Sequence, residues 1–236
     1  MIGAIINSVA VLVGGFGGAA LGGRMPTRLK VGLPAIFGVA SMAMGVVMIV
    51  KVNTIGVMVI SVLLGCVVGE LAYVEKGIGV AASALNRFIG RVVPIPGNIT
   101  HEEFLEKYVA IVVLFCASGT GIFGALHESM TGDPSILIAK AALDLLTSAI
   151  FATTLGYAVG VVAVPQIIIM VLIELGAVFI EPLMSGGAEA NFSAVGGVLM
   201  LATGFRICGL KNFPIANMLP ALIFVIPVTT LWSLVF

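Results

Sequence analysis

Residues 38–45 read GVASMAMG, and residues 197–204 read GVLMLATG, 159 positions further along the chain. Both stretches begin and end with glycine, and they share the valine after the first glycine and the alanine two places before the last. Extended outward without a gap, this register places Asn7 on the chemically similar Gln166, and it runs to the end of the chain. Self-similarity at a fixed offset in an apolar chain indicates a repeat, which is how many transporters are built. Accidental alignment of two apolar stretches of similar composition is the alternative.

The amino-acid composition indicates that this chain resides in a lipid bilayer. Hydrophobic residues make up 60% of the 236 positions and charged residues 9%, whereas about a quarter of an ordinary soluble domain is charged. The lipid bilayer is therefore the expected partner. Lys and Arg (11) balance Asp and Glu (11), which argues against nucleic acid. Cys66, Cys116 and Cys208 form no CxxC pair, so neither a disulfide framework, a metal site nor a cofactor is expected.

Eight stretches have the length and apolar character of a membrane-spanning helix, which needs about 20 apolar residues. We therefore predict an all-α polytopic membrane protein. The predicted spans are Ile2–Leu21, Val31–Val50, Thr54–Val74, Tyr108–Gly124, Ile136–Gly160, Val164–Pro182, Phe192–Phe205 and Pro214–Val235.

The repeat and one polar stretch divide the chain into four parts. Between the third and fourth spans, apolar residues recur at helical spacing with basic residues off that stripe, as in an interfacial amphipathic helix on the cytoplasmic surface. The predicted parts are 1–74 (first transmembrane repeat), 75–107 (interfacial segment), 108–163 (central pair of spans) and 164–236 (second repeat).

Basic residues predict the orientation. Nearly all Lys and Arg fall in alternate connections, while the connections around 127–133 and 185–191 carry acids and no bases. The positive-inside rule then places both termini outside the cytoplasm. No basic n-region precedes the first span, so we expect that span to be retained. Spans one to three correspond to spans six to eight, and a shift of five spans inverts the second three-helix copy.

Gly14, Gly18 and Gly22 form a row on one face of the first span. Small residues at this spacing allow another helix to approach closely. Two interpretations stay open, burial among helices of the same chain and a homo-oligomer interface through these three glycines.

Lys140 and Asp144 are the most costly residues to place in a membrane, because both are charged and both lie in the fifth predicted span. They are four positions apart, on one face of that helix. A charge at the bilayer centre costs at least about 2.5 kcal/mol on insertion scales. The pair is either a salt bridge within its own helix or part of a substrate or proton pathway.

Other polar residues at membrane depth extend this candidate pathway. Glu174 is a possible proton carrier, or a glutamate hydrogen-bonded to a neighbouring helix. Ser118 and Thr120 belong to the run CASGTG at 116–121, which either unwinds and offers backbone groups or packs closely against another helix. Asn7 and Gln166 occur at equivalent repeat positions, and we expect both to face the interior.

No enzyme is expected from the motifs. His101-Glu102 and His127-Glu128 lack the second histidine of HExxH, since positions 105 and 131 hold leucine and threonine. Gly132-Asp133 lacks the preceding glycine of an intramembrane aspartyl protease, and nothing in the sequence brings Ser118 and His127 together as a nucleophile and its base.

Five motifs give the chain a family resemblance: GAIIN at 3–7, MPTRLK at 25–30, the segment from Gly132-Asp133 to Leu143-Asp144, SAVGG at 193–197 and NMLPA at 217–221. Together they resemble the YqgA and YdfK family of prokaryotic multi-span membrane proteins, end to end. The resemblance implies a polytopic inner-membrane protein of uncharacterised function. It also implies that Asn7, Lys140, Asp144 and Asn217 occupy recurrent positions, whereas Gly119 stands where the family has proline.

Two functions from different classes follow. The first is a secondary transporter for a small polar solute or ion. The second is a membrane-embedded binding or assembly subunit that transports nothing. Access of solvent to Asp144 favours the first, and tight helix packing around it favours the second.

Overall fold

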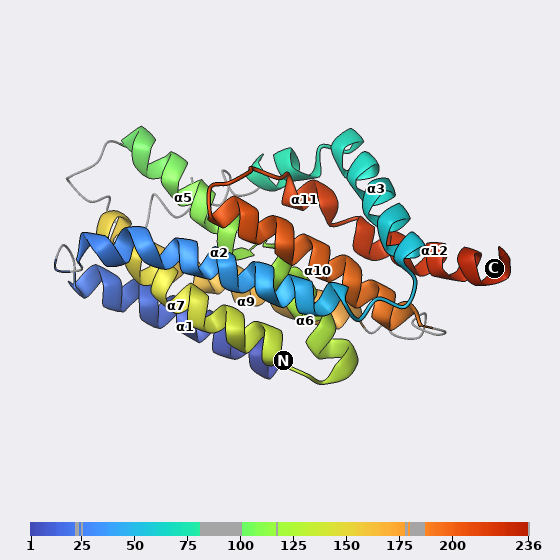
Figure 1. The fold of residues 1–236 in the computed structure, drawn as a ribbon. Helices are drawn as coiled ribbons and strands as arrows, with labels where there is room; N and C mark the ends of the chain where they lie inside the picture. The colour runs from blue at the N-terminus through green and yellow to red at the C-terminus, as the bar shows by residue number, and fades with distance from the viewer. Residues whose placement is uncertain are drawn as a thin grey trace. The chain divides into compact units, whose positions relative to one another are not determined.

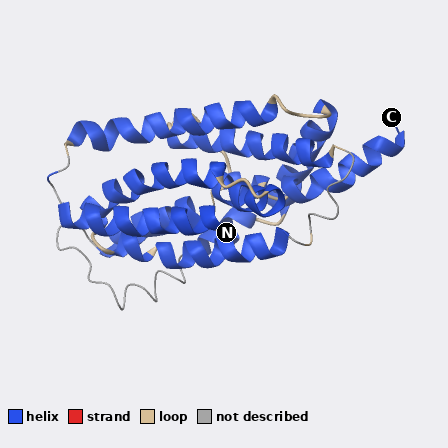
Figure 2. Cartoon of the chain, turned by 90° about the horizontal axis from the view of Figure 1, so that it is seen from below, coloured by secondary structure: helices blue, strands red, loops and turns tan. Residues whose placement is uncertain are grey.

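The computed structural model describes residues 1–21, 24, 26–80, 101–116, 118–177, 179 and 187–235. The regular elements of these residues are all helices (Figures 1 and 2), which confirms the predicted all-α class. The chain forms two compact units. The first comprises Met1–Pro34 and Gly77–Leu175, and the second comprises Ala35–Lys76 and Gly176–Phe236. Each unit therefore combines residues from the first and last thirds of the chain.

The helices of the first unit come from the start and the middle of the chain. They are α1 (Ile2–Leu21), the beginning of α2 (Thr27–Ile49), α5 (His101–Cys116), α6 (Gly119–Thr131), α7 (Ser135–Leu155), α8 (Ala158–Val161) and most of α9 (Ala163–Ala177). The second unit contains the rest of α2, then α3 (Ile55–Leu71), α10 (Ala188–Ile207), α11 (Ile215–Met218) and α12 (Ala221–Val235).

Five helical stretches of the described chain are long and apolar enough to cross a membrane, or six if one bent pair counts as a span. They match the first, fifth, sixth, seventh and eighth predicted spans. The five stretches are Ile2–Leu21, Ser135–Leu155, Ala158–Ala177, Ala188–Ile207 and Ile215–Val235. The eight spans predicted from the sequence are thus met only in part.

The other three predicted spans are met by a shorter described apolar helix or by an interrupted one. The second lies in α2, which runs from Thr27 to Ile49 and whose apolar stretch among the described residues is Ala35–Ile49. The third is the bent pair, in which Ile55–Leu71 and Val74–Val80 meet at 50° beside Tyr73, whose φ is 52°. The fourth is broken in two, since α5 ends at Cys116 and α6 begins at Gly119.

The predicted interfacial helix cannot be followed through, because 81–100 lie outside the described residues. The predicted fifth span ends earlier than expected, at Leu155. Gly156 follows with φ 67° and ψ −154°, a backbone conformation open to glycine and costly for other residues, and this terminates α7.

Small residues on α1 bring the backbones of the first unit together. A β-carbon at Gly14 would collide with the Leu145 carbonyl oxygen and the Ser148 hydroxyl of α7, and one at Gly18 would collide with the Ala149 backbone. Gly15 meets Gly160 of α8 in the same way. Packing within the chain therefore accounts for Gly14 and Gly18. Gly22 lies outside the described residues, and a homo-oligomer stays a prediction.

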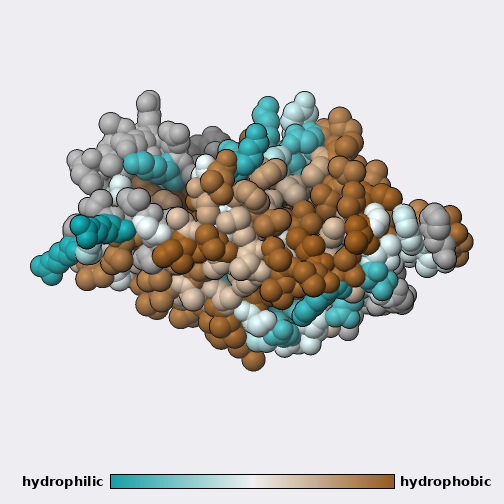
Figure 3. All heavy atoms as spheres, viewed as in Figure 1, coloured by the Kyte–Doolittle hydropathy of each residue, from teal (hydrophilic) through white to brown (hydrophobic). Residues whose placement is uncertain are grey.

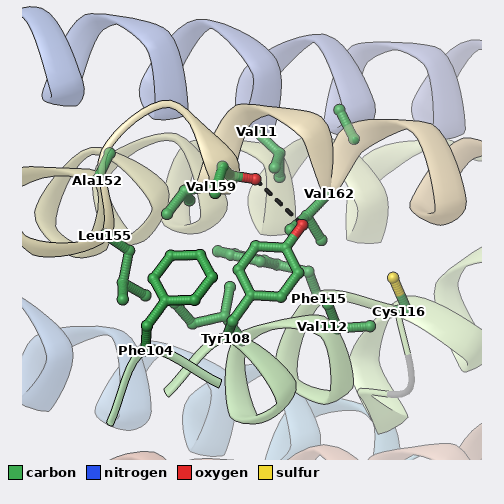
Figure 4. Packing of buried hydrophobic residues seen from close by; sticks show 13 residues of the cluster. Val11, Phe104, Tyr108, Val112, Phe115, Cys116, Ala152, Leu155, Val159 and Val162 are labelled. Carbon is green, nitrogen blue, oxygen red and sulfur yellow. Dashed lines mark hydrogen bonds between the residues drawn. The ribbon is translucent and has the colours of Figure 1, made fainter. Parts of the chain in front are cut away.

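An aromatic core completes the first unit. Phe104, Tyr108 and Phe115 of α5 pack on Leu155 and Val159 (Figure 4). The Tyr108 hydroxyl donates a hydrogen bond to the Ala158 carbonyl at 3.2 Å, so its polar atom has a partner in an apolar environment. This contact fixes α5 against the start of the α8–α9 stretch.

In the second unit, α2 and α10 run antiparallel and touch through glycine. A β-carbon at Gly45 would lie 2.5 Å from the Gly197 carbonyl oxygen, and one at Gly38 would lie 2.8 Å from that of Gly204. Between these contacts, the Ser41 hydroxyl donates to the Met200 carbonyl at 2.9 Å. The repeated segments that open the sequence thus pack against each other.

Two asparagines fix the ends of the second unit. The Asn191 side-chain oxygen accepts from the Thr54 N–H at 2.8 Å, and the Asn217 side-chain oxygen accepts from the Glu75 N–H at 2.7 Å. Arg206 donates to Glu75 at 2.8 Å. These side chains satisfy backbone and charged groups where helices begin and bend.

Apolar side chains also cover the outside of the helices. On α1, Ile5, Leu12 and Phe16 are exposed while Gly14 and Gly18 are buried. Hydrophobic residues dominate the face seen in Figure 3. An outward apolar surface of this kind suits lipid as the surrounding solvent.

Candidate functional site

The predicted charged pair lies on the buried face of α7. Lys140 and Asp144 are only 3% and 8% exposed, and Lys140 Nζ donates directly to Asp144 Oδ2. Since the two residues are one helical turn apart, the helix itself positions the pair. The Phe115 ring of α5 lies 5.8 Å from the ammonium group, near enough for a cation–π interaction.

Two amides from other helices join the carboxylate. Asn7 Nδ2 of α1 donates to Asp144 Oδ2 at 2.9 Å. Gln166 Nε2 of α9 donates to Asn7 Oδ1 at 2.6 Å and to Asp144 Oδ2 at 3.3 Å. Both amides are fully buried, which places them in the interior as expected from the sequence. We call these four residues, Asn7, Lys140, Asp144 and Gln166, the polar cluster.

The helix break adjoins the polar cluster. Ser118 caps α6, and its hydroxyl accepts from the Gly121 N–H at 3.1 Å, so serine stabilises a new helix start inside the predicted fourth span. A β-carbon at Gly121 would lie 3.0 Å from Lys140 Cε and 2.9 Å from the Ser118 hydroxyl. The ammonium-bearing end of Lys140 therefore packs on the first turn of α6. Thr120, in the same turn, is also buried.

Glu174 does not join the polar cluster. It lies eight residues beyond Gln166 on α9, about 12 Å along the helix axis. Its carboxylate pairs with the N-terminal ammonium of Met1 at 3.1 Å, and its carbonyl accepts from the Ser129 hydroxyl at 3.0 Å. These contacts tie Glu174 to Met1 and to Ser129, the latter through the backbone carbonyl, and its role as a proton carrier stays a prediction.

Glu128 is a buried acid that the sequence did not single out. Its carboxylate accepts from the Gly3 N–H at 3.0 Å and pairs with the Met1 ammonium at 2.9 Å. Burial alone would raise the pKa of Glu128, but these two partners outweigh burial and hold the pKa below its usual value. Its helical spacing from Gly121 and Gly124, along one face of α6, was the available signal.

No group of three or more His, Cys, Asp or Glu side chains is arranged to hold a metal ion in the part of the chain that the structure describes. The chemistry available at the polar cluster is instead that of one ammonium, one carboxylate, two amides and a helix start.

Comparisons with known proteins find one family and two relatives that match nearly the whole chain. The profile of the family described as "Protein of unknown function (DUF554)" matches residues 2–230. The chain is 48% identical over 233 residues to "Uncharacterized protein YqgA" of Escherichia coli K12, covering 99% of this chain and 98% of that protein. It is 24% identical over 227 residues to "Uncharacterized membrane protein YdfK" of Bacillus subtilis 168, covering 94% and 93%. No solved structure matches.

Proposed function

Because this chain belongs to the DUF554 family, whose description gives no activity, its function has to be inferred from its own site, and we propose that it is a secondary transporter for a small polar solute or ion. The observation that carries the proposal is the buried Lys140–Asp144 pair, bonded to two amides and set beside a helix break. Ionisable residues inside membrane helices are costly and commonly mark transport routes. Broken helices are a recurrent element of transporter binding sites.

The contacts of the first unit support an inverted repeat. If the two thirds of the chain are symmetric copies, each contact between them has a counterpart in which one residue is moved forward by 159 positions and the other backward by 159. The counterpart of the Gly15–Gly160 contact is the pair Glu174 and Met1, and these two residues are in contact. The Asn7–Gln166 hydrogen bond is its own counterpart, because moving both residues by 159 positions exchanges them. A local twofold axis that passes through the Asn7–Gln166 pair would relate contacts in this way.

The second unit supports the same symmetry independently. By the same 159-residue shift, the counterpart of the Gly38–Gly204 contact is the Gly45–Gly197 contact, and both are present. The Ser41–Met200 hydrogen bond is its own counterpart. Equivalent helices in this unit run antiparallel, as they must in a copy inverted about an axis in the membrane plane. We infer that spans one to three and six to eight are inverted copies.

Inverted repeats suit alternating access, in which a site near the midplane opens to each side in turn. On this proposal the polar cluster is the midplane site. Both termini are extracytoplasmic, and the protein resides in the prokaryotic inner membrane with its basic connections in the cytoplasm. Ser118 and Thr120 line the route beside the break, and Glu174 is a second protonatable group along α9.

Uptake into proteoliposomes tests the proposal. Wild-type protein is reconstituted and offered radiolabelled amino acids, small organic acids and inorganic ions one at a time. We expect accumulation of at least one solute class, and we expect Asp144→Asn to reduce it at least tenfold. The matched control is Asp133→Asn, the same chemical change at an exposed carboxylate between α6 and α7. Wild-type uptake by Asp144→Asn contradicts a role of the Lys140–Asp144 pair in transport, and no uptake of any solute by the folded wild type contradicts transport.

Close packing beside Asp144 favours the alternative, a membrane-embedded binding or assembly subunit. Gly14 of α1 meets Leu145 and Ser148 of α7, next to Asp144. Copurification separates the two functions. An assembly subunit is recovered from native membranes in a stoichiometric complex and shows no uptake, whereas a transporter shows uptake when purified alone.

A further inference from the structure

The polar cluster has hydrogen-bonding capacity that the described residues do not fill. An ammonium group has three N–H donors, and the described hydrogen-bond partner of Lys140 Nζ is Asp144 alone. Gln166 Oε1 is buried without a hydrogen-bond partner among the described residues. An unpaired buried amide oxygen costs about 1–3 kcal/mol, and a ligand that donates to this oxygen would remove that cost.

The orientation of the Gln166 amide is set by its neighbours. Its nitrogen lies between two acceptors, Asn7 Oδ1 and Asp144 Oδ2. Rotating the amide would place its oxygen against both of them and lose both hydrogen bonds. The unpaired oxygen is therefore held away from the carboxylate, and it can accept only from a donor that lies outside the cluster.

The helix start at the break between α5 and α6 adds a partial positive charge, and the polar cluster has no further negative group to neutralise it. Lys140 and Asp144 carry one charge each, of opposite sign. The start of α6 adds about half a positive charge. Lys140 Cε packs on the first turn of α6, so two positive groups meet there. This arrangement favours a bound anion and disfavours a metal cation.

We propose that the polar cluster binds a small solute that has a carboxylate and, next to it, a hydroxyl or ammonium group. The carboxylate accepts from Lys140, beside the positive end of α6. The adjacent hydroxyl or ammonium donates to Gln166 Oε1. As a transport substrate this solute rests on the proposed function, but its binding does not require transport.

Ligand-induced thermal stabilisation of the purified full chain in detergent tests the inference. Three probes are titrated. Lactate has a carboxylate and a hydroxyl, propionate has the same carboxylate and chain length without the hydroxyl, and ethanolamine has donors without a carboxylate. We expect lactate to bind about tenfold more tightly than propionate, a difference of about 1.4 kcal/mol, and ethanolamine to give no shift in melting temperature. Equal binding of lactate and propionate, or a shift with ethanolamine, overturns the inference.

The variant Gln166→Met assigns the donor contact. It removes Oε1 while keeping side-chain length, so the preference for lactate over propionate should fall to less than twofold. If the substitution only loosens the site, the affinities for lactate and propionate fall by the same factor and their ratio stays tenfold. That result would contradict a contact between the hydroxyl and Gln166 Oε1. Ser129→Ala, which removes a hydroxyl at the Glu174 end of the same unit, is the control and should keep the tenfold preference.

The carboxylate contact is tested with Lys140→Met and, because that change leaves Asp144 unpaired, also with Lys140→Met combined with Asp144→Asn. Both should weaken lactate binding at least tenfold, and retained affinity in the folded double variant overturns the contact. Lactate binding without uptake into proteoliposomes contradicts the transporter proposal and leaves this site intact. Uptake of a solute without a carboxylate, with no lactate binding, contradicts this site and leaves transport intact.

Discussion

Asp144 Oδ2 accepts hydrogen bonds from side chains on three helices, Lys140 of α7, Asn7 of α1 and Gln166 of α9. Lys140→Met leaves a buried carboxylate without its cation, and we expect a loss of about 3–5 kcal/mol in the free energy of unfolding. Asp144→Asn leaves Lys140 unpaired, with a loss of similar size. Reversible unfolding in mixed detergent micelles measures both.

Combining Lys140→Met with Asp144→Asn separates structure from transport. The double variant holds no unpaired charge, so its stability should exceed that of either single variant. Uptake should nevertheless stay lost if the pair lies on the route. Recovery of uptake together with stability would show that the pair is only a structural clamp.

Glu128 makes stability depend on pH. Its pKa is lower in the folded protein than the ordinary carboxyl value, so it contributes stability that is fully present above the ordinary pKa of 4.5 and is lost as the pH falls through the lowered folded value. We expect the melting temperature of the wild type to drop in this acid range. Glu128→Gln should show a smaller drop, whereas Glu189→Gln, at an exposed acid of α10, should follow the wild type.

At the scale of elements, glycines test the packing of α1 on α7. Gly14→Ala places a methyl group against the Leu145 carbonyl, so the helices must separate, and we expect a loss of about 1–3 kcal/mol in the free energy of unfolding. Gly17→Ala is the matched control, because no atom outside its own helix lies within 4 Å of the new methyl group. That change should be neutral or stabilising by up to about 1 kcal/mol. Equal losses at both positions would contradict the α1–α7 contact.

Periodicity and register predicted some of these contacts and not others. The spacing of Lys140 and Asp144 predicts their pairing, because one helix supplies both residues. The 159-residue register predicts that Asn7 and Gln166 are equivalent, but it carries no information on which third helix they meet, so their bonds to Asp144 were not foreseen. The break at Ser118 was one of two alternatives, since a small polar run suits helix unwinding and close packing equally.

Glu128 shows why another feature of the site was missed. Glu128 is buried only because α6 brings it to the N–H of Gly3, a contact across 125 positions that local pattern does not encode.

For the whole molecule, the proposed orientation is testable by labelling. In a variant in which Cys66, Cys116 and Cys208 are replaced, a single cysteine is introduced at Asp133 or at Arg28, both exposed positions. A membrane-impermeant maleimide added to intact spheroplasts should modify the cysteine at 133 and should reach the one at 28 only after lysis. The opposite pattern reverses the orientation. Labelling of both sites in intact spheroplasts contradicts the assignment of these connections to opposite sides.

The hydrogen bond between Asn7 and Gln166 has an evolutionary consequence. Two identical amides that meet across a twofold axis are confined to a symmetric arrangement, in which each amide donates to the other. On the proposed repeat, an ancestral dimer of identical half-length chains would have had such a symmetric pair at its centre. On the same proposal, gene duplication and fusion would have allowed the two halves to diverge, so that one position carries asparagine and the other an amide one methylene longer. The fused chain can thereby distinguish its two halves at the point where they are otherwise most alike.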